Sequence, residues 1–208
     1  YHLCVTTQCQ VYKRPRVKNK KIQQAIKETS NVIITYKDKP INSFYHGSNG
    51  GISAKASESW KIEDISYFKV IIDGSKSLSN FFKLPIRNES KLNQFLNFDK
   101  EKFYGSNHSL FRWDKRISGN IITDKLIKNK LISKNDNVLD LKVLERGLSG
   151  RVTRLKIEMN DPNKSIVLIK DDIRQIFSFL PSNLFTINKL NDNFWFFRGG
   201  GFGHGVGL

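Results

Sequence analysis

A histidine enclosed by glycines is the first candidate for chemistry in this sequence. Residues 198–208 contain six glycines, and His204 stands directly between Gly203 and Gly205. Glycine reaches backbone conformations with φ > 0 and lets another molecule approach the main chain closely. The imidazole would therefore have little shielding, which suits a proton carrier or a ligand. The alternative is a flexible terminal tail, but the aromatic run at 194–197 is more typical of a buried strand that leads into a loop.

The second candidate is a polar loop at residues 46–51. His46 and Ser48 precede Gly50 and Gly51, and the glycines predict a tight turn with exposed backbone N–H groups. Such a turn is suited to a sugar hydroxyl, an N-acetyl carbonyl or a carboxylate, although an ordinary glycine-rich turn is the alternative. Trp60 follows nearby. Its flat apolar ring could stack on a pyranose face, and packing in a core is the other interpretation.

The two cysteines form a third candidate site near the start of the chain. Cys4 and Cys9 are separated by four residues, and His2 adds another soft ligand. This spacing is wider than Cys-x-x-Cys, so zinc binding is one possibility among three. A disulfide and two unrelated free thiols are the others.

The composition indicates a folded chain with a core. The 208 residues allow one large or two small domains, and 38% of them are hydrophobic and 12% aromatic. The sequence contains no run of about 20 apolar residues, so we expect no transmembrane helix within it. Its first residues do not have the basic-then-apolar pattern of a signal peptide. Because the sequence begins at Tyr1 without a methionine, we expect further sequence upstream, and any membrane anchor would lie outside these residues.

The charge predicts an anionic partner. Lysine and arginine total 35 against 19 acidic residues, which gives a net charge of +16. Nucleic acid, anionic lipid and an acidic cell wall are the candidate partners, and a general lysine-rich bias is the alternative. The sequence contains no RNA-recognition aromatic signature, zinc-finger spacing or basic heptad helix. We therefore expect no nucleic acid partner.

The hydrophobic periodicity predicts an α+β fold made of antiparallel β-hairpins and a few short helices. We expect residues 1–208 to form a single compact domain with an inserted loop region at 74–106. Helices are expected at 19–28, 90–98, 121–131 and 171–179, and strands at 32–36, 41–45, 65–72, 111–113, 138–144, 151–157, 166–169, 184–188 and 193–197. The arginines of the turn between 138–144 and 151–157, Arg146 and Arg151, are expected to decorate a hairpin.

Three motifs resemble those of one family. The segments are 44–51, 145–152 and 198–207, and they look like the histidine–serine–glycine loop, the Glu-Arg-Gly-x-Ser-Gly-Arg-Val hairpin and the closing glycine signature of the stage II sporulation protein D / amidase enhancer family. The cysteine segment and the helix-then-hairpin order also resemble that family, so the resemblance covers most of 1–208. Three positions depart from the family loop: Gly47 stands where the family has serine, and Ser48 and Asn49 stand where it has threonine and serine.

The resemblance implies a bacterial, extracytoplasmic protein that acts on peptidoglycan. The implied reaction is lytic transglycosylation, in which glycan strands are cut after their stem peptides have been removed. In that chemistry one carboxyl serves as acid and then as base. The family's catalytic glutamate motif, which precedes the cysteine segment, has no counterpart here, and Glu58 is expected to be structural or auxiliary. We therefore expect that segment upstream, with the present residues as the substrate cradle. The alternatives are a non-catalytic enhancer of an amidase and, less favoured, a basic nucleic-acid-binding domain.

The resemblance also implies roles for the cradle. Arg198 and the glycine-loop amides would hold a lactyl carboxylate or an acetamido oxygen, and His204 would orient the cleft or hydrogen-bond the sugar. No cofactor is required, with zinc at Cys4 and Cys9 as the possible exception. The expected substrate-binding residues are His46, Ser48, Gly50, Gly51, Trp60, Arg198, Gly203, His204 and Gly205.

Overall fold

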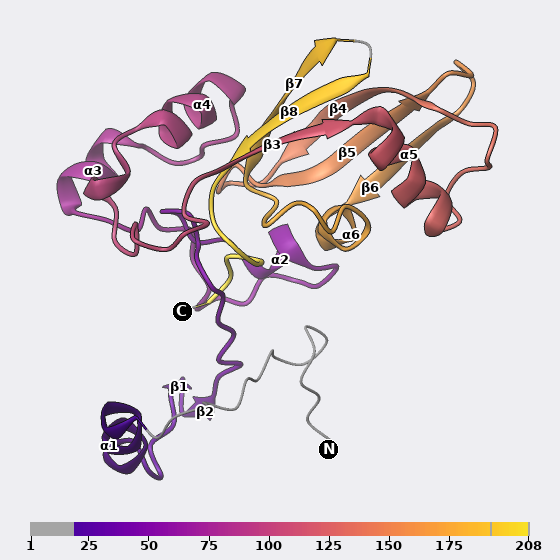
Figure 1. Ribbon diagram of the computed structural model, residues 1–208. Coiled ribbons are helices and arrows are strands. Elements are labelled where there is room, and N and C mark those ends of the chain that lie inside the picture. Colours follow the sequence, from indigo (N-terminus) through magenta and orange to yellow (C-terminus); the bar gives the residue numbers. More distant parts are fainter. Residues whose placement is uncertain (1–18, 192, 208) are drawn as a thin grey trace. The chain divides into compact units, whose positions relative to one another are not determined.

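The computed structural model describes residues 19–191 and 193–207 (Figure 1). They divide into two compact units, the first ending at Asn42 and the second beginning at Ser43. In the first unit, the helix α1 spans Lys20–Glu28. The side chain of Asn19 accepts hydrogen bonds from the backbone amides of Lys21 and Ile22 and so caps the helix, which confirms the one predicted at 19–28.

The predicted hairpin at 32–45 is much shorter in the structure. Only β1, Thr35–Tyr36, and β2, Lys39–Pro40, pair with each other. Lys37 and Asp38 form the turn between them with φ of 50° and 60°. Pro40 has no N–H to extend the ladder, and both strands are exposed, so no buried face supports longer strands. The predicted return strand at 41–45 is therefore wrong, and His46 does not follow a strand end.

The second unit contains two antiparallel three-stranded sheets. One sheet has the order β4-β5-β6 and the other has the order β3-β8-β7. The predicted hairpins at 138–157 and 184–197 are confirmed. The strands are β3 Trp113–Ser118, β4 Val138–Arg146, β5 Val152–Met159, β6 Ser165–Ile169, β7 Phe185–Asn191 and β8 Phe194–Gly199.

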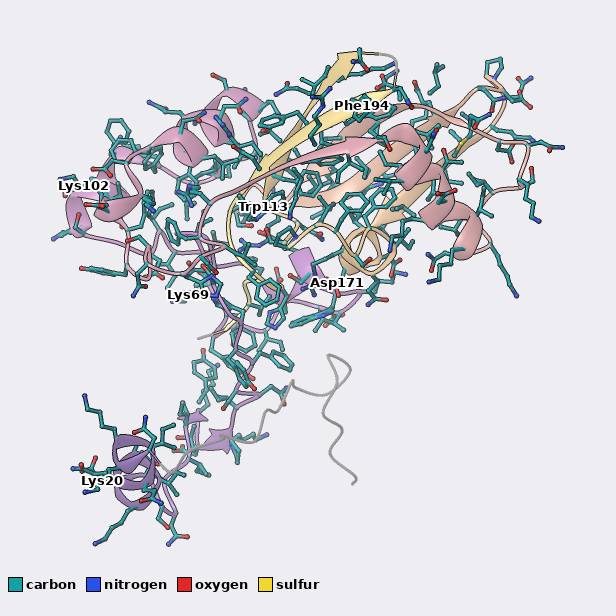
Figure 2. All side chains as sticks on the ribbon, in the orientation of Figure 1. Lys20, Lys69, Lys102, Trp113, Asp171 and Phe194 are labelled. Carbon is teal, nitrogen blue, oxygen red and sulfur yellow. The ribbon has the colours of Figure 1, made fainter. Side chains whose placement is uncertain are left out.

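Side chains from both sheets share the largest hydrophobic cluster. Trp195 and Phe197 of β8 are fully buried, and they alternate with less buried neighbours as a half-buried strand requires. Trp113, at the start of β3, joins the same cluster (Figure 2). Two helices, α5 Gly119–Lys128 and α6 Asp171–Ile176, cover this core. The aromatic run at 194–197 is thus the buried strand that leads into the glycine loop.

The predicted insertion at 74–106 contains the expected helix at 90–98 and two further short helices that the sequence did not predict. It contains α3 Lys76–Phe81, α4 Glu89–Asn97 and the short 3-10 helix η1 Lys100–Lys102. Its apolar side chains form most of a second hydrophobic cluster, and Figure 1 shows α3 and α4 at the opposite end of the sheets from α5. The helix α3 was not predicted because the apolar residues of this segment are scattered among polar ones, and they form a core only when α3 and α4 pack together.

Two other predicted elements differ in detail. The strand at 65–72 is reduced to a single bridge between Ile72 and Ile52. The sequence favours Asp171 as the N-cap of the helix predicted at 171–179. In the structure Lys170 occupies the N-cap position, and Asp171 is the first helical residue, where its carboxylate binds Arg174. The α+β class is nevertheless confirmed, with short helices around antiparallel sheets. Within the ranges that the structure describes, none of the helices combines the length and the apolar character needed to cross a membrane.

Candidate functional site

The glycine loop is docked against the 46–51 loop. Ser48 and Phe202 form a reciprocal backbone pair, with N–H···O distances of 3.1 Å and 2.8 Å. Farther along, the N–H of Ala54 donates to the carbonyl of Gly205 at 2.8 Å. The two segments that the sequence singled out therefore lie side by side, near α2, Ala56–Ser59 (Figure 1). This pairing excludes the flexible-tail interpretation of His204.

The glycines are needed for this docking. Gly203 and Gly205 have φ of 105° and 75°, which side chains rarely adopt. A Cβ on Gly205 would lie 2.0 Å from Nη2 of the buried Arg151. On the facing loop, a Cβ on Gly50 would lie 2.6 Å from the carbonyl carbon of Gly200. The glycine pattern thus serves close packing, of backbone against backbone at Gly50 and of backbone against the buried Arg151 side chain at Gly205.

The docking brings His46, His204 and Trp60 together. The two imidazole centroids are 6.0 Å apart in an edge-on arrangement, and the Trp60 ring lies 4.7 Å from that of His204. The hydroxyl of Ser59 donates to the carbonyl of His204 at 3.0 Å, which ties the loop to α2. Three side chains from distant parts of the sequence therefore form one cluster of rings.

The surroundings lower the pKa of both imidazoles and so favour their neutral forms. Burial, together with the neighbouring His46, lowers the pKa of His204 to about 4. Burial also lowers the pKa of His46, although the Val206 carbonyl opposes this. The N–H of Val206 donates to Nδ1 of His204 at 3.0 Å, so the ring proton of His204 lies on Nε2. Nδ1 of His46 lies 3.2 Å from the carbonyl of Val206, so it carries a proton and leaves Nε2 as an acceptor.

The neighbouring turn does not offer the free amides that its glycines suggest. The N–H of Gly50 donates to the hydroxyl of Ser48 at 3.3 Å, and the N–H of Gly51 donates to the side-chain oxygen of Asn49 at 2.7 Å. Ser and Asn side chains commonly satisfy backbone groups two residues on. The expectation of exposed N–H groups is therefore wrong for these two residues, and their role is to shape the turn.

Trp60 combines packing with partial exposure. Its ring packs 5.0 Å from that of Phe44 and adjoins a small cluster of buried residues around Phe68. The side chain is nevertheless half-buried rather than enclosed. Both interpretations of this tryptophan thus hold in part, because the ring is fixed in place by its neighbours and keeps surface that a ligand can contact.

Arg198 lies apart from the ring cluster. Its guanidinium binds both carboxylate oxygens of Asp114, at 2.9 Å and 3.0 Å, and the side-chain oxygen of Asn97 at 2.6 Å. Asp114 lies directly opposite on β3, and it raises the pKa of Arg198. The structure thus groups the other predicted site residues of 46–60 and 203–205, and it does not bring Arg198 into contact with them.

A buried polar network that the sequence did not predict supports the cluster. Glu58 is 4% exposed, and its carboxylate accepts hydrogen bonds from both the N–H and the hydroxyl of Ser149. Burial raises the pKa of Glu58, although Ser149 and Arg151 oppose this. A Cβ on Gly147 would collide with the Glu58 side chain. The Glu-Arg-Gly-x-Ser-Gly-Arg hairpin turn is therefore shaped around this carboxyl.

The arginines of the same turn are buried, so the prediction that they decorate a hairpin is wrong. Arg151 is 1% exposed and donates to the carbonyls of Ile52 and Asn49 at 3.0 Å and 2.9 Å. Burial lowers its pKa to about 10. Arg146 donates to Glu89 and to backbone carbonyls. Because carbonyls of the 46–52 loop need donors, Arg151 fixes the loop that carries His46.

No metal site is evident in the described part of the chain, where no cluster of three or more His, Cys, Asp or Glu side chains is arranged to hold an ion. Cys4 and Cys9 lie outside the described residues. The zinc, disulfide and free-thiol alternatives for these residues therefore stay predictions.

Two families match the chain. Residues 54–207, most of the sequence, match the family described as a domain of unknown function, DUF8618. The chain belongs to the DUF8618 family. The DUF8618 region includes Trp60, Ser149, Arg151 and the glycine loop. A different family, described as stage II sporulation protein, matches residues 1–36. The predicted resemblance to the stage II family is thus supported at 1–36, and that match does not extend to the three motifs at 44–51, 145–152 and 198–207. No curated protein matches the chain.

Proposed function

We propose that this protein binds the glycan strands of peptidoglycan, with the ring cluster of His46, His204 and Trp60 as its binding site. The observation that carries the proposal is the gathering of these three side chains, with ring centroids 6.0 Å and 4.7 Å apart. A half-exposed indole provides a flat face for a pyranose ring. The neutral imidazoles provide one Nε2 donor and one Nε2 acceptor, which match a sugar hydroxyl or an acetamido group.

The charge and the match to the stage II sporulation family support the same substrate. The net charge of +16 favours an anionic polymer. The match at 1–36 is to a sporulation protein family and is consistent with a cell-wall role. The corresponding location is extracytoplasmic, in a bacterial cell envelope.

For the reaction, we infer lytic transglycosylation of strands from which stem peptides have been removed, and this chain contributes substrate binding. The family's catalytic glutamate motif has no counterpart in the sequence. Glu58 is a poor substitute because it is buried and its oxygens are bound by Ser149. We therefore assign Glu58 a structural role. Arg198 could hold a lactyl carboxylate only by exchanging its bond to Asp114.

The second candidate function is a non-catalytic enhancer of a cell-wall amidase. Two carboxylates influence the imidazoles electrostatically, Asp73 at His46 and Asp171 at His204. Asp73 accepts a hydrogen bond from Asn49, and Asp171 is paired with Arg174. Since both carboxylates already have partners, the ring cluster favours binding over acid–base catalysis.

The test uses purified glycan strands, intact or stripped of stem peptides. Retention of this chain on the strands is measured, and strands incubated with the full-length protein are examined by mass spectrometry for 1,6-anhydromuramyl ends. We expect retention on stripped strands. Trp60→Leu should weaken it by up to about tenfold, the value of a lost aromatic contact. Phe81→Leu is the matched control, since Phe81 is 57% exposed and lies outside the ring cluster.

The outcomes separate the candidates. Anhydro ends that form only from stripped strands establish the transglycosylase. Retention without cleavage, together with stimulation of an added amidase, establishes the enhancer. No retention by the unmodified chain, or equal retention by the Trp60 and Phe81 variants, contradicts the proposed binding site.

A further inference from the structure

A cavity lies beside α2, next to the ring cluster. Its volume is about 520 Å³, within the range of small-molecule sites. Charged side chains of both signs form most of its wall. They are Lys55, Glu58, Asp64, Arg87, Glu145, Arg154 and Lys170.

Most of these charges already have partners. Lys55 is bound to Asp64 at 2.8 Å, Lys170 donates to the carbonyl of Trp60 at 3.0 Å, and Glu58 is held by Ser149. The guanidinium groups of Arg87 and Arg154 differ, because they form no ion pair and no hydrogen bond within the described residues.

Arg154 lies opposite Glu145 in the β4–β5 register, and no ion pair joins the two side chains. The cavity wall therefore includes two arginines whose guanidinium donors have no partner among the described residues. A guanidinium is a planar fork of donors that fits the two oxygens of a carboxylate.

We propose that Arg87 and Arg154 form a subsite for a carboxylate carried by the bound glycan. The inference rests on the proposed function, because it takes the ligand to be the strand that contacts the ring cluster. In peptidoglycan, alternate sugars bear a lactyl carboxylate and the others are neutral. A carboxylate subsite beside a neutral stacking site therefore matches the alternation of the strand.

The two sites share one short segment of chain. Glu58 lines the cavity, while the adjacent Ser59 and Trp60 contact His204 through a hydrogen bond and a ring contact. Lys170 connects them again, since it lines the cavity and binds the Trp60 carbonyl. An extended ligand stacked on Trp60 thus has the cavity as its neighbour. Arg198, which the sequence favoured for this role, is bound to Asp114 instead.

The experiment compares two probes with the full chain. One is a peptide-free tetrasaccharide of alternating N-acetylglucosamine and N-acetylmuramic acid. The other is the same molecule with its carboxylates converted to neutral amides. Dissociation constants are measured by calorimetry for the unmodified chain and for Arg87→Gln, Arg154→Gln and Arg116→Gln. The last variant is the control, because it removes an exposed guanidinium from β3, outside the cavity.

We expect the unmodified chain to bind the carboxylate probe about tenfold more tightly than the amide probe, the order of one charge-assisted hydrogen bond. Arg154→Gln and Arg87→Gln should each reduce this preference and leave the affinity for the amide probe unchanged. Arg116→Gln should keep the preference.

Equal affinity for the two probes in the unmodified chain would overturn the subsite and leave the glycan-binding proposal intact. Arginine variants that keep the full preference would also overturn it. Failure of the unmodified chain to bind either probe would instead remove the proposed function, and the subsite with it.

Discussion

Replacing His204 by glutamine should remove a large part of the acid sensitivity of the fold. In the folded protein, burial and the neighbouring His46 lower the pKa of His204 to about 4, from an ordinary value of 6.5. The unfolded chain takes up a proton near pH 6.5, and the folded chain resists this until about pH 4. Protonation therefore favours the unfolded state throughout that interval.

The sign and size of the effect follow from this difference. The stability contributed by neutral His204 is fully present above pH 6.5 and is lost as the pH falls through the interval to about 4. The loss amounts to about 3 kcal/mol in the free energy of unfolding. This is an upper value, because the ring is only half-buried and keeps some contact with solvent.

The assay is urea unfolding of the unmodified chain and the variant at a series of pH values from 7.5 to 4. Other groups titrate in this range, so the informative quantity is the difference between the two proteins. The difference should shift by up to about 3 kcal/mol in favour of the variant as the pH falls. His108→Gln is the control for loss of an imidazole, and it should keep the acid sensitivity. Parallel pH profiles for the unmodified chain and His204→Gln would refute the reasoning.

Three further substitutions test the packing around the ring cluster by urea unfolding at pH 7. Gly205→Ala should destabilise the fold by more than about 2 kcal/mol, because it combines a left-handed backbone with a collision against Arg151. Ser149→Ala should cost about 1–3 kcal/mol, because it removes a buried hydroxyl that binds Glu58. Arg198→Gln should cost less than about 1 kcal/mol, because its ion pair is exposed.

These three predictions have separate ways to fail. Gly105→Ala is the matched control for Gly205→Ala, since Gly105 has φ of 67° and nothing within 4 Å of an added Cβ. If the two alanine variants lose equal stability, the collision with Arg151 does not occur. An unchanged stability in Ser149→Ala would mean that the Glu58 network is not formed. A large loss in Arg198→Gln would indicate a structural role that its exposure does not suggest.

Most strands of the two sheets could be predicted, because each has a local pattern of apolar residues in the sequence. The alternation in β5 and the aromatic run in β8 each place apolar residues on a buried face. The strand predicted at 65–72 is wrong, because its apolar residues pair with another segment only at the single bridge between Ile72 and Ile52. Within 74–106 the helix at 90–98 was predicted, and α3 was not, because the core of this segment forms only when the two helices pack together.

The candidate site could be predicted only in part. Glycine patterns located the two loops around His46 and His204, because close main-chain packing requires glycine at particular positions. The network of Glu58, Ser149 and Arg151 joins residues about 90 positions apart, and sequence spacing does not reveal such a contact. Its local signal was the pair of glycines in the hairpin turn, which make room for the carboxyl of Glu58 and for neighbouring backbone.

The most direct test of the central claim is an NMR titration with the peptide-free tetrasaccharide. The ring signals of His46 and His204 and the indole signal of Trp60 are assigned from single-residue variants and followed as the ligand is added. Binding at the ring cluster predicts saturable shifts of all three signals with a common dissociation constant. Unchanged signals at ligand concentrations that saturate retention on strands, or shifts confined to other residues, would contradict the claim that this cluster binds the glycan.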